Sequence, residues 1–162
     1  MRPRGPTHPQ IKLLLVEDDG LIRTGLLQTL KNFDIIIVGE AVTAKEAMDK
    51  SARLKPDIIL MDITLPDCSG IIAAARIRKS SHAARVIMFS SDDDEELVRS
   101  SLAAGASGYC VKGMHLELLA LAIRSVHAGA VWLDSAIATR VLADYSREKQ
   151  QEDGATNMKD QS

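Results

Sequence analysis

The stretch PDIILMD (residues 56–62) predicts a buried strand that ends in an unexpected charge. Its apolar centre, Ile58 to Met61, is short and rich in branched side chains, and Pro56 precedes it, as is typical of a strand in a sheet core. Asp62 ends the run. Open α/β sheets form their binding sites at the carboxyl ends of strands, so Asp62 is the first candidate for a functional residue.

A second acidic strand end lies near the N-terminus. The apolar run from Ile11 to Val16 is followed at once by Glu17, Asp18 and Asp19. Acidic residues also favour the first turn of a helix, and this is the expected role of Asp19. Two acidic strand ends in one small domain suggest a bound cation beside a reactive carboxylate.

Strand-like and helix-like segments alternate through the middle of the chain. The apolar runs cover residues 11–16, 35–38, 57–61, 85–89 and 107–111, and helical patterns cover about 20–32, 43–54, 69–79, 93–104 and 115–128. This alternation predicts a parallel sheet with helices on both faces. Five βα units between residues 11 and 130 fit a flavodoxin-like, doubly wound α/β domain with the strand order 2-1-3-4-5.

The flanking segments are predicted to lie outside this domain. Residues 1–10 are polar and contain three prolines, which indicates a flexible arm rather than a signal peptide. A C-terminal helix is expected over residues 131–146, where Asp134 or Ser135 can cap it. The polar residues 147–162 have no apolar period and indicate a linker or a disordered tail.

Composition argues against several classes of protein. The chain has 162 residues, enough for one core, and 46% of them are hydrophobic. A net charge of −2 argues against a general nucleic-acid or membrane-surface binder. Cys68 and Cys110 have no metal-binding spacing, and no apolar stretch is long enough to span a bilayer. We therefore expect a cytoplasmic protein that by itself binds neither nucleic acid nor a membrane.

The predicted sheet brings the two acidic strand ends together. Strands 1 and 3 of this fold are neighbours about 4.8 Å apart, so Glu17, Asp18 and Asp62 should converge. Carboxylates this close repel one another unless a cation or a proton neutralises them. Oxygen ligands without Cys or His favour a hard divalent ion, and Mg²⁺ is the expected cofactor. Asp18 should bind it directly and Glu17 through water, and the backbone carbonyl of Thr64 could complete the shell.

Two later strand ends add further polar groups. Ser90 follows the apolar residues 86–89, and Lys112 follows residues 109–111. The long side chain of Lys112 could reach over the neighbouring strand to Asp62. A cation, an ammonium group and a hydroxyl around one carboxylate suit a bound tetrahedral anion. A carboxylate can itself act as a nucleophile and form an aspartyl phosphate.

Four segments carry these strand ends: LLLVEDD (13–19), PDIILMDITLP (56–66), VIMFSS (86–91) and GASGYCVK (105–112). Together they resemble the receiver domain of two-component response regulators, in order and at the expected separations over residues 11–130. The later stretch HAGAVWLD (127–134) resembles the subgroup in which a LuxR-type helix-turn-helix output domain follows the receiver.

The resemblance implies a phosphorelay role. A sensor histidine kinase or a phosphotransfer protein would donate a phosphoryl group to Asp62, with Mg²⁺ in the acidic cluster. Ser90 and Lys112 would bind the phosphoryl oxygens, and the rotamer of Tyr109 would be coupled to Ser90. Such a protein catalyses only its own phosphorylation and dephosphorylation. The chain would be either a stand-alone receiver or a truncated transcription regulator, which would reach DNA only through an output domain that it lacks.

Some positions depart from the family pattern, namely Gly20, the segment Asp67-Cys68-Ser69-Gly70, and Gly113. They leave the proposed site intact. One alternative is a metal-dependent phosphohydrolase with an aspartate nucleophile, although its usual second Asp, two residues later, is here Thr64. The other is a degenerate receiver that binds partners without phosphorylation, which the presence of all four residues of the expected site, Asp18, Asp62, Ser90 and Lys112, argues against.

The last helical pattern of the predicted domain contains two leucines on the side away from its core stripe. Leu118 and Leu121 fall nearly opposite Leu119 and Ile123 on a helical wheel. Exposed leucines on an end helix indicate an interface. The sequence leaves two partners open: a second receiver, which would make a homodimer, or the C-terminal helix of the same chain.

Overall fold

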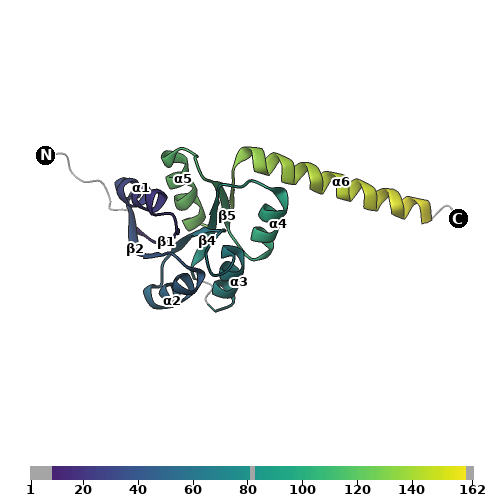
Figure 1. Cartoon of the computed structure of the whole chain (residues 1–162). Coiled ribbons are helices and arrows are strands. Elements are labelled where there is room, and N and C mark those ends of the chain that lie inside the picture. The colour runs from purple at the N-terminus through teal and green to yellow at the C-terminus, as the bar shows by residue number, and fades with distance from the viewer. Residues whose placement is uncertain (1–8, 81–82, 160–162) are drawn as a thin grey trace.

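The computed structural model describes residues 9–80 and 83–159, without the side chains of residues 153 and 156–159. All but the last two residues of the predicted arm, and residues 160–162 of the predicted tail, lie outside the described residues. The described chain forms a parallel sheet between two layers of helices, and one long helix projects from it (Figure 1).

The strands lie in the order β2-β1-β3-β4-β5-β6, and every adjacent pair is parallel. Their bounds are Ile11–Val16 (β1), Ile35–Ala41 (β2), Ile58–Asp62 (β3), Arg85–Ser90 (β4), Gly108–Val111 (β5) and Trp132–Leu133 (β6). The predicted flavodoxin-like order 2-1-3-4-5 is confirmed for the first five strands. All five residues of β3 are buried, because helices cover both faces of a parallel sheet.

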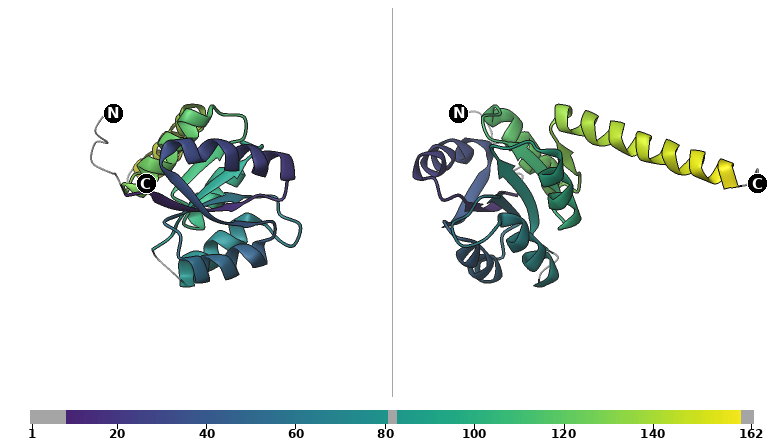
Figure 2. Two further views of the ribbon diagram at one scale, coloured as in Figure 1. Left: turned by 90° about the vertical axis from the view of Figure 1, so that its left-hand side faces the viewer. Right: turned by 45° about the vertical axis from the view of Figure 1, so that its right-hand side comes forward.

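Five helices flank the sheet, and a short 3-10 helix, η1, follows the first of them. They are α1 (Gly20–Leu30), η1 (Lys31–Phe33), α2 (Ala44–Leu54), α3 (Gly70–Ser80), α4 (Glu95–Ala103) and α5 (Leu116–His127). Helices α1 and α5 pack on one face, where Leu26 and Ile123 join one buried cluster. Helices α2, α3 and α4 cover the other face, where Ala47 and Val98 join a second cluster (Figure 2, left). The site-forming ends of the strands therefore lie between two helical layers.

A sixth strand is an addition to the predicted five-stranded sheet. β6 is only two residues long, and it pairs with β5 through Gly108 opposite Trp132 and Tyr109 opposite Leu133. The Trp132 N–H donates to the carbonyl of Ser107 at 3.0 Å. Two residues are too few to show a strand period in a sequence, which is why the pattern did not predict this strand.

The C-terminal helix is longer than the sequence predicted. α6 runs over Ser135–Lys159 rather than 131–146, so the expected end at residue 146 and the alternative of a disordered tail from 147 are wrong for the described residues. The other alternative, a linker, stays a prediction. Residues 147–159 have no apolar stripe because they project from the domain (Figure 1). Their Glu, Lys, Gln, Arg and Ala are nevertheless strong helix formers, and Arg147 pairs with Asp144 one turn earlier.

Among the helices of the described residues, none combines the length and apolar character that crossing a membrane would need.

Candidate functional site

Glu17, Asp18 and Asp62 meet at the carboxyl ends of β1 and β3. These strands are neighbours with Val16 opposite Met61, so the residue that follows each lies at the same edge of the sheet. One oxygen of each carboxylate lies within 4.8 Å of the others. Glu17 and Asp62 are buried, whereas Asp18 is exposed. The predicted convergence is thus present, with one of the three acids open to solvent.

Lys112 reaches this cluster from the end of β5. Its ammonium Nζ lies 2.8 Å from Glu17 Oε2 and 3.1 Å from Asp62 Oδ2. The same nitrogen lies 5.8 Å from the centre of the Phe89 ring on β4, within the range of a cation–π contact. The expected reach of Lys112 across β4 to Asp62 is confirmed. The supporting role of Phe89 was missed, because an apolar residue inside a strand reads as core.

The surroundings of Asp62 shift its acidity. Burial, and then the charge of Glu17, raise the pKa of Asp62 from 3.8 to about 6. Hydrogen bonds from Lys112 and from the Thr64 N–H, which lies 3.1 Å from Asp62 Oδ1, oppose this rise. Burial lowers the pKa of Lys112, but the close contacts with Glu17 and Asp62 and the charges of both acids together outweigh it and raise that pKa. At neutral pH, Asp62 is therefore mostly an anion beside a protonated lysine.

Glu17 has one oxygen that no hydrogen bond satisfies. Its Oε1 accepts the Asp19 N–H at 3.1 Å. Its Oε2 has the ionic contact with Lys112, which is not aligned as a hydrogen bond. Among the described residues this is the only buried side-chain polar atom left without a hydrogen bond. A buried anionic oxygen, in a cluster of oxygen donors without sulfur or imidazole, fits a hard divalent cation such as Mg²⁺.

The loop after β3 packs closely behind Asp62. The Gly70 N–H donates to the Ile63 carbonyl at 2.7 Å, and Thr64 pairs with Ser69 in an isolated bridge. A Cβ on Gly70 would lie 1.9 Å from the Asp62 carbonyl oxygen, so the backbone approach requires glycine. The described contact of Thr64 with Asp62 is made by its N–H. A metal-binding role for the Thr64 carbonyl stays a prediction.

Ser90 and Tyr109 are connected through one loop residue. Ser90 Oγ accepts the Asp92 N–H at 3.1 Å, and the Tyr109 hydroxyl donates to the Asp92 carbonyl. Tyr109 is fully buried, and burial raises its pKa, helped by the charges of Asp92, Asp93 and Asp94. The sequence placed Ser90 and Tyr109 on neighbouring strands, but it gave no sign that the backbone of Asp92 would join them.

Asp134 has a different role from the predicted helix cap. Its Oδ2 accepts the Val111 N–H at 3.0 Å, and its Oδ1 accepts the Trp132 indole N–H at 3.3 Å. Only its backbone carbonyl serves α6, where it accepts the Ala138 N–H at 2.9 Å. Asp134 therefore holds the end of β5 immediately before Lys112, across a sequence distance that no local pattern reveals.

The two leucines on α5 are exposed. Leu118 and Leu121 have relative exposures of 44% and 43%, whereas Leu119 and Ile123 are buried as predicted. α6 packs against α4 and leaves both exposed leucines in solvent. The alternative in which the C-terminal helix covers them is therefore wrong, and the homodimer remains a prediction.

Comparisons with known proteins all indicate the same family. A family model of the response regulator receiver domain matches residues 13–124. The transcriptional regulatory protein LnrK of Bacillus subtilis is 32% identical over 141 residues, which cover 86% of this chain and 64% of LnrK. The nitrate/nitrite response regulator protein NarL of Escherichia coli is 36% identical over 132 residues, which cover 81% of this chain and 61% of NarL. The chain thus spans about three fifths of the length of these relatives.

Solved structures agree with the sequence matches. A LuxR-family two-component response regulator from Aurantimonas has a TM-score of 0.80 at 30% identity, over 85% of this chain and 99% of that one. A complex of CheX and CheY with beryllium fluoride and magnesium from Borrelia burgdorferi contains a chain with a TM-score of 0.66 at 28% identity, over 72% of this chain and 88% of that one. Receiver domains are signalling modules and generally bind Mg²⁺ at an acidic site, and the phosphohydrolase alternative is not favoured. The chain belongs to the receiver domains of two-component response regulators, related to the LuxR-type regulators.

Proposed function

We propose that Asp62 is the phosphoacceptor of this receiver and that a sensor histidine kinase or a phosphotransfer protein is the donor. The observation that carries this proposal is the environment of the Asp62 carboxylate. It is buried at the end of β3, with Lys112 Nζ 3.1 Å from one oxygen and the Thr64 N–H 3.1 Å from the other. Two donors on opposite oxygens orient the carboxylate, and orientation is a large part of the rate of such a transfer.

The transfer needs only one nucleophilic oxygen and groups that bind the phosphoryl oxygens. An Asp62 carboxylate oxygen attacks the phosphorus of the donor phosphohistidine, and a P–O bond forms as the P–N bond breaks. The electron pair of the broken bond stays on the imidazole nitrogen. Lys112 then moves its ammonium from the carboxylates to the phosphoryl oxygens, and the Ser90 hydroxyl donates a hydrogen bond to another. Hydrolysis of the aspartyl phosphate returns the chain to its starting state, so it acts only on its own phosphoryl group.

Glu17, Asp18 and Asp62 would hold Mg²⁺ beside this carboxylate, with Asp18 as a direct ligand, Glu17 through water, and the Thr64 carbonyl completing the shell. When bound, the ion neutralises negative charge on the phosphoryl group during transfer. The unsatisfied Glu17 Oε2 supports this assignment, since its charge has only Lys112 as a partner. When the Lys112 ammonium moves to the phosphoryl group, Glu17 Oε2 would have the cation as its remaining partner.

The response to phosphorylation would pass from Ser90 through Asp92 to Tyr109 and bias a two-state equilibrium. The relatives named as transcription regulators support control of a LuxR-type output domain, through which DNA would be reached. Leu118 and Leu121 would serve as a homodimer interface on α5. A cytoplasmic location is the one that fits contact with the kinase.

Intact-mass measurement after incubation with Mg²⁺ and a small phosphodonor tests the assignment. We expect an increase by the mass of one phosphoryl group in the parent protein and none in Asp62→Asn. Asp57→Asn is the matched control, because Asp57 lies just before the other end of β3 and should leave the adduct intact. An unmodified parent protein, or a modified Asp62→Asn variant, would contradict the proposal.

A further inference from the structure

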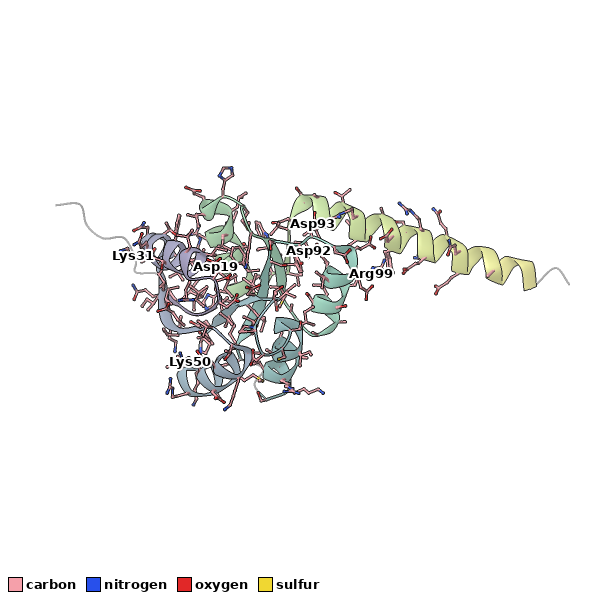
Figure 3. The ribbon with its side chains drawn as sticks, in the orientation of Figure 1. Asp19, Lys31, Lys50, Asp92, Asp93 and Arg99 are labelled. Carbon is pink, nitrogen blue, oxygen red and sulfur yellow. The ribbon has the colours of Figure 1, made fainter. Side chains whose placement is uncertain are left out.

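Helix α6 is held against α4 and the loop before it by ion pairs and one buried side chain. Arg140 donates from one guanidinium nitrogen to Asp93, 3.0 Å from its carbonyl oxygen and 3.1 Å from Oδ2. Arg99 on α4 pairs with Asp144 at 3.4 Å and with Glu148 at 3.2 Å. Figure 3 labels Asp93 and Arg99 where the loop and α4 meet this helix.

One buried side chain of α6 lies in the same apolar cluster as the predicted switch residue. Ile137 is 2% exposed and belongs to the same apolar cluster as Tyr109 and Val98. Tyr109 in turn donates to the Asp92 carbonyl. The first two turns of α6 therefore contact the loop at Asp93 and share an apolar cluster with Tyr109.

The loop between β4 and α4 is thus hydrogen-bonded from two sides, at the consecutive residues Asp92 and Asp93. From the site, Ser90 Oγ accepts the Asp92 N–H at 3.1 Å and Tyr109 binds the Asp92 carbonyl. From α6, Arg140 binds the carbonyl and side chain of Asp93. Because Asp92 and Asp93 are joined by one peptide bond, a displacement of either residue shifts the contacts of the other.

The hydrogen bond from the Asp92 N–H determines how the Ser90 hydroxyl is oriented. A serine hydroxyl has one proton to donate and lone pairs that accept. With the Asp92 N–H on a lone pair, the proton of Ser90 is available to a phosphoryl oxygen at Asp62. If the loop is released, the hydroxyl loses this fixed orientation, and ordering it again costs binding free energy.

We propose that Arg140 is a positioning residue for phosphoryl binding: by holding Asp93, docked α6 keeps Ser90 oriented towards the phosphoryl group. This inference rests on the proposed phosphoryl site at Asp62. Coupling between two binding events is reciprocal, so a phosphoryl group at Asp62 should in turn tighten α6 against α4. Arg140 and Asp93 are both exposed enough for their loss to leave the fold intact.

Beryllium fluoride with Mg²⁺ provides a phosphoryl analogue whose affinity can be followed by fluorine NMR. We expect Arg140→Ala to weaken its binding by about fivefold, the low end of coupling between sites. Arg140→Lys should restore much of the affinity, since a single nitrogen makes both contacts with Asp93. Arg147→Ala is the matched control, because Arg147 pairs with Asp144 of its own helix and should leave the affinity unchanged.

Two further readouts separate positioning from a general loss of structure. The affinity for Mg²⁺ alone, measured by calorimetry, should be equal in the parent protein and Arg140→Ala, because the acidic cluster lies on β1 and β3. Hydrogen exchange of the α6 amides should slow when beryllium fluoride binds the parent protein, since a detached helix of this length frays in water. That slowing should be reduced in Arg140→Ala.

Each outcome has a definite meaning. Equal beryllium fluoride affinity in the parent protein and Arg140→Ala, or tighter binding by the variant, overturns the inference and leaves Asp62 as phosphoacceptor. An equal loss of Mg²⁺ affinity overturns it as well, because the effect would then not act through Ser90. If the parent protein binds no beryllium fluoride, the proposed function itself fails, and the inference fails with it.

Discussion

Replacing Asp62 by asparagine should stabilise the metal-free protein at neutral pH, although it removes the proposed phosphoacceptor. The reason is the cost of ionising a buried acid beside Glu17, which raises the pKa of Asp62 from 3.8 to about 6. Asparagine keeps the shape of the side chain and carries no charge, so it resembles the protonated acid. Lys112 retains Glu17 as a partner at 2.8 Å.

The pH dependence of this effect has a definite sign. Between the unfolded and the folded pKa, the native state binds more protons than the unfolded state, so stability falls as pH rises through the window from about 4 to about 6. At about 1.36 kcal/mol per pKa unit, the full shift corresponds to at most about 3 kcal/mol at pH 7. At pH 5, where native Asp62 is still mostly protonated, ionising Asp62 lowers the unfolding free energy by about half as much.

Urea unfolding in a chelator at pH 5, 6, 7 and 8 measures the difference. The gain in unfolding free energy for Asp62→Asn should about double from pH 5 to pH 7 and then level off. Asp49→Asn on α2, an exposed acid, is the control and should change stability by less than about 0.5 kcal/mol. An Asp62→Asn variant that is no more stable than the parent protein at pH 7, or whose gain in stability is the same at pH 5, would contradict this prediction. Added Mg²⁺ should remove the advantage by stabilising only the parent protein.

Three further changes test the site and the surface. Gly70→Ala should lower the unfolding free energy by about 3 kcal/mol, measured in urea, because its Cβ would lie 1.9 Å from the Asp62 carbonyl oxygen. Gly25→Ala is the control: with open space around its Cβ, it should raise the unfolding free energy by about 0.5–1 kcal/mol. Equal effects of the two substitutions would disprove the close approach at Gly70. Lys112→Met should cost about 3 kcal/mol in the chelator, since it leaves buried acids without their cation, and a neutral result would show that the pair is not tight. Leu118→Glu should abolish concentration-dependent sedimentation if α5 is the dimer interface, and unchanged self-association would remove that interpretation.

The alternation of elements and the acidic strand ends could be predicted because both are local. Five apolar runs of strand length, separated by helical periods, are enough to indicate a doubly wound sheet. Asp62 is conspicuous for the same reason, since a charge directly after Ile58 to Met61 breaks an otherwise buried strand. Once the strand order is known, the convergence of Glu17 and Asp18 on Asp62 follows from strand spacing alone.

Other parts of the site depend on contacts between residues distant in the sequence. The Val111 N–H could have bonded to many acceptors, and only the packing of β6 beside β5 brings Asp134 to it. The requirement for Gly70 likewise arises from the approach of one backbone to another, which no spacing in the sequence records. The shifted pKa of Asp62 belongs to this group, because burial, its largest cause, is a property of the folded chain.

The C-terminal helix shows the division between the two sources of information most clearly. The sequence by itself determined a receiver-like sheet with a reactive acid at its edge, because both the periodicity of each element and the residues at each strand end can be recognised within a short segment. The polar residues 147–159 could be read as a tail, since an exposed helix needs no apolar stripe. Only the tertiary structure decided that α6 packs on α4 through Arg99, and on the loop before α4 through Arg140, rather than covering Leu118. The reason is that each ion pair joins residues more than forty positions apart.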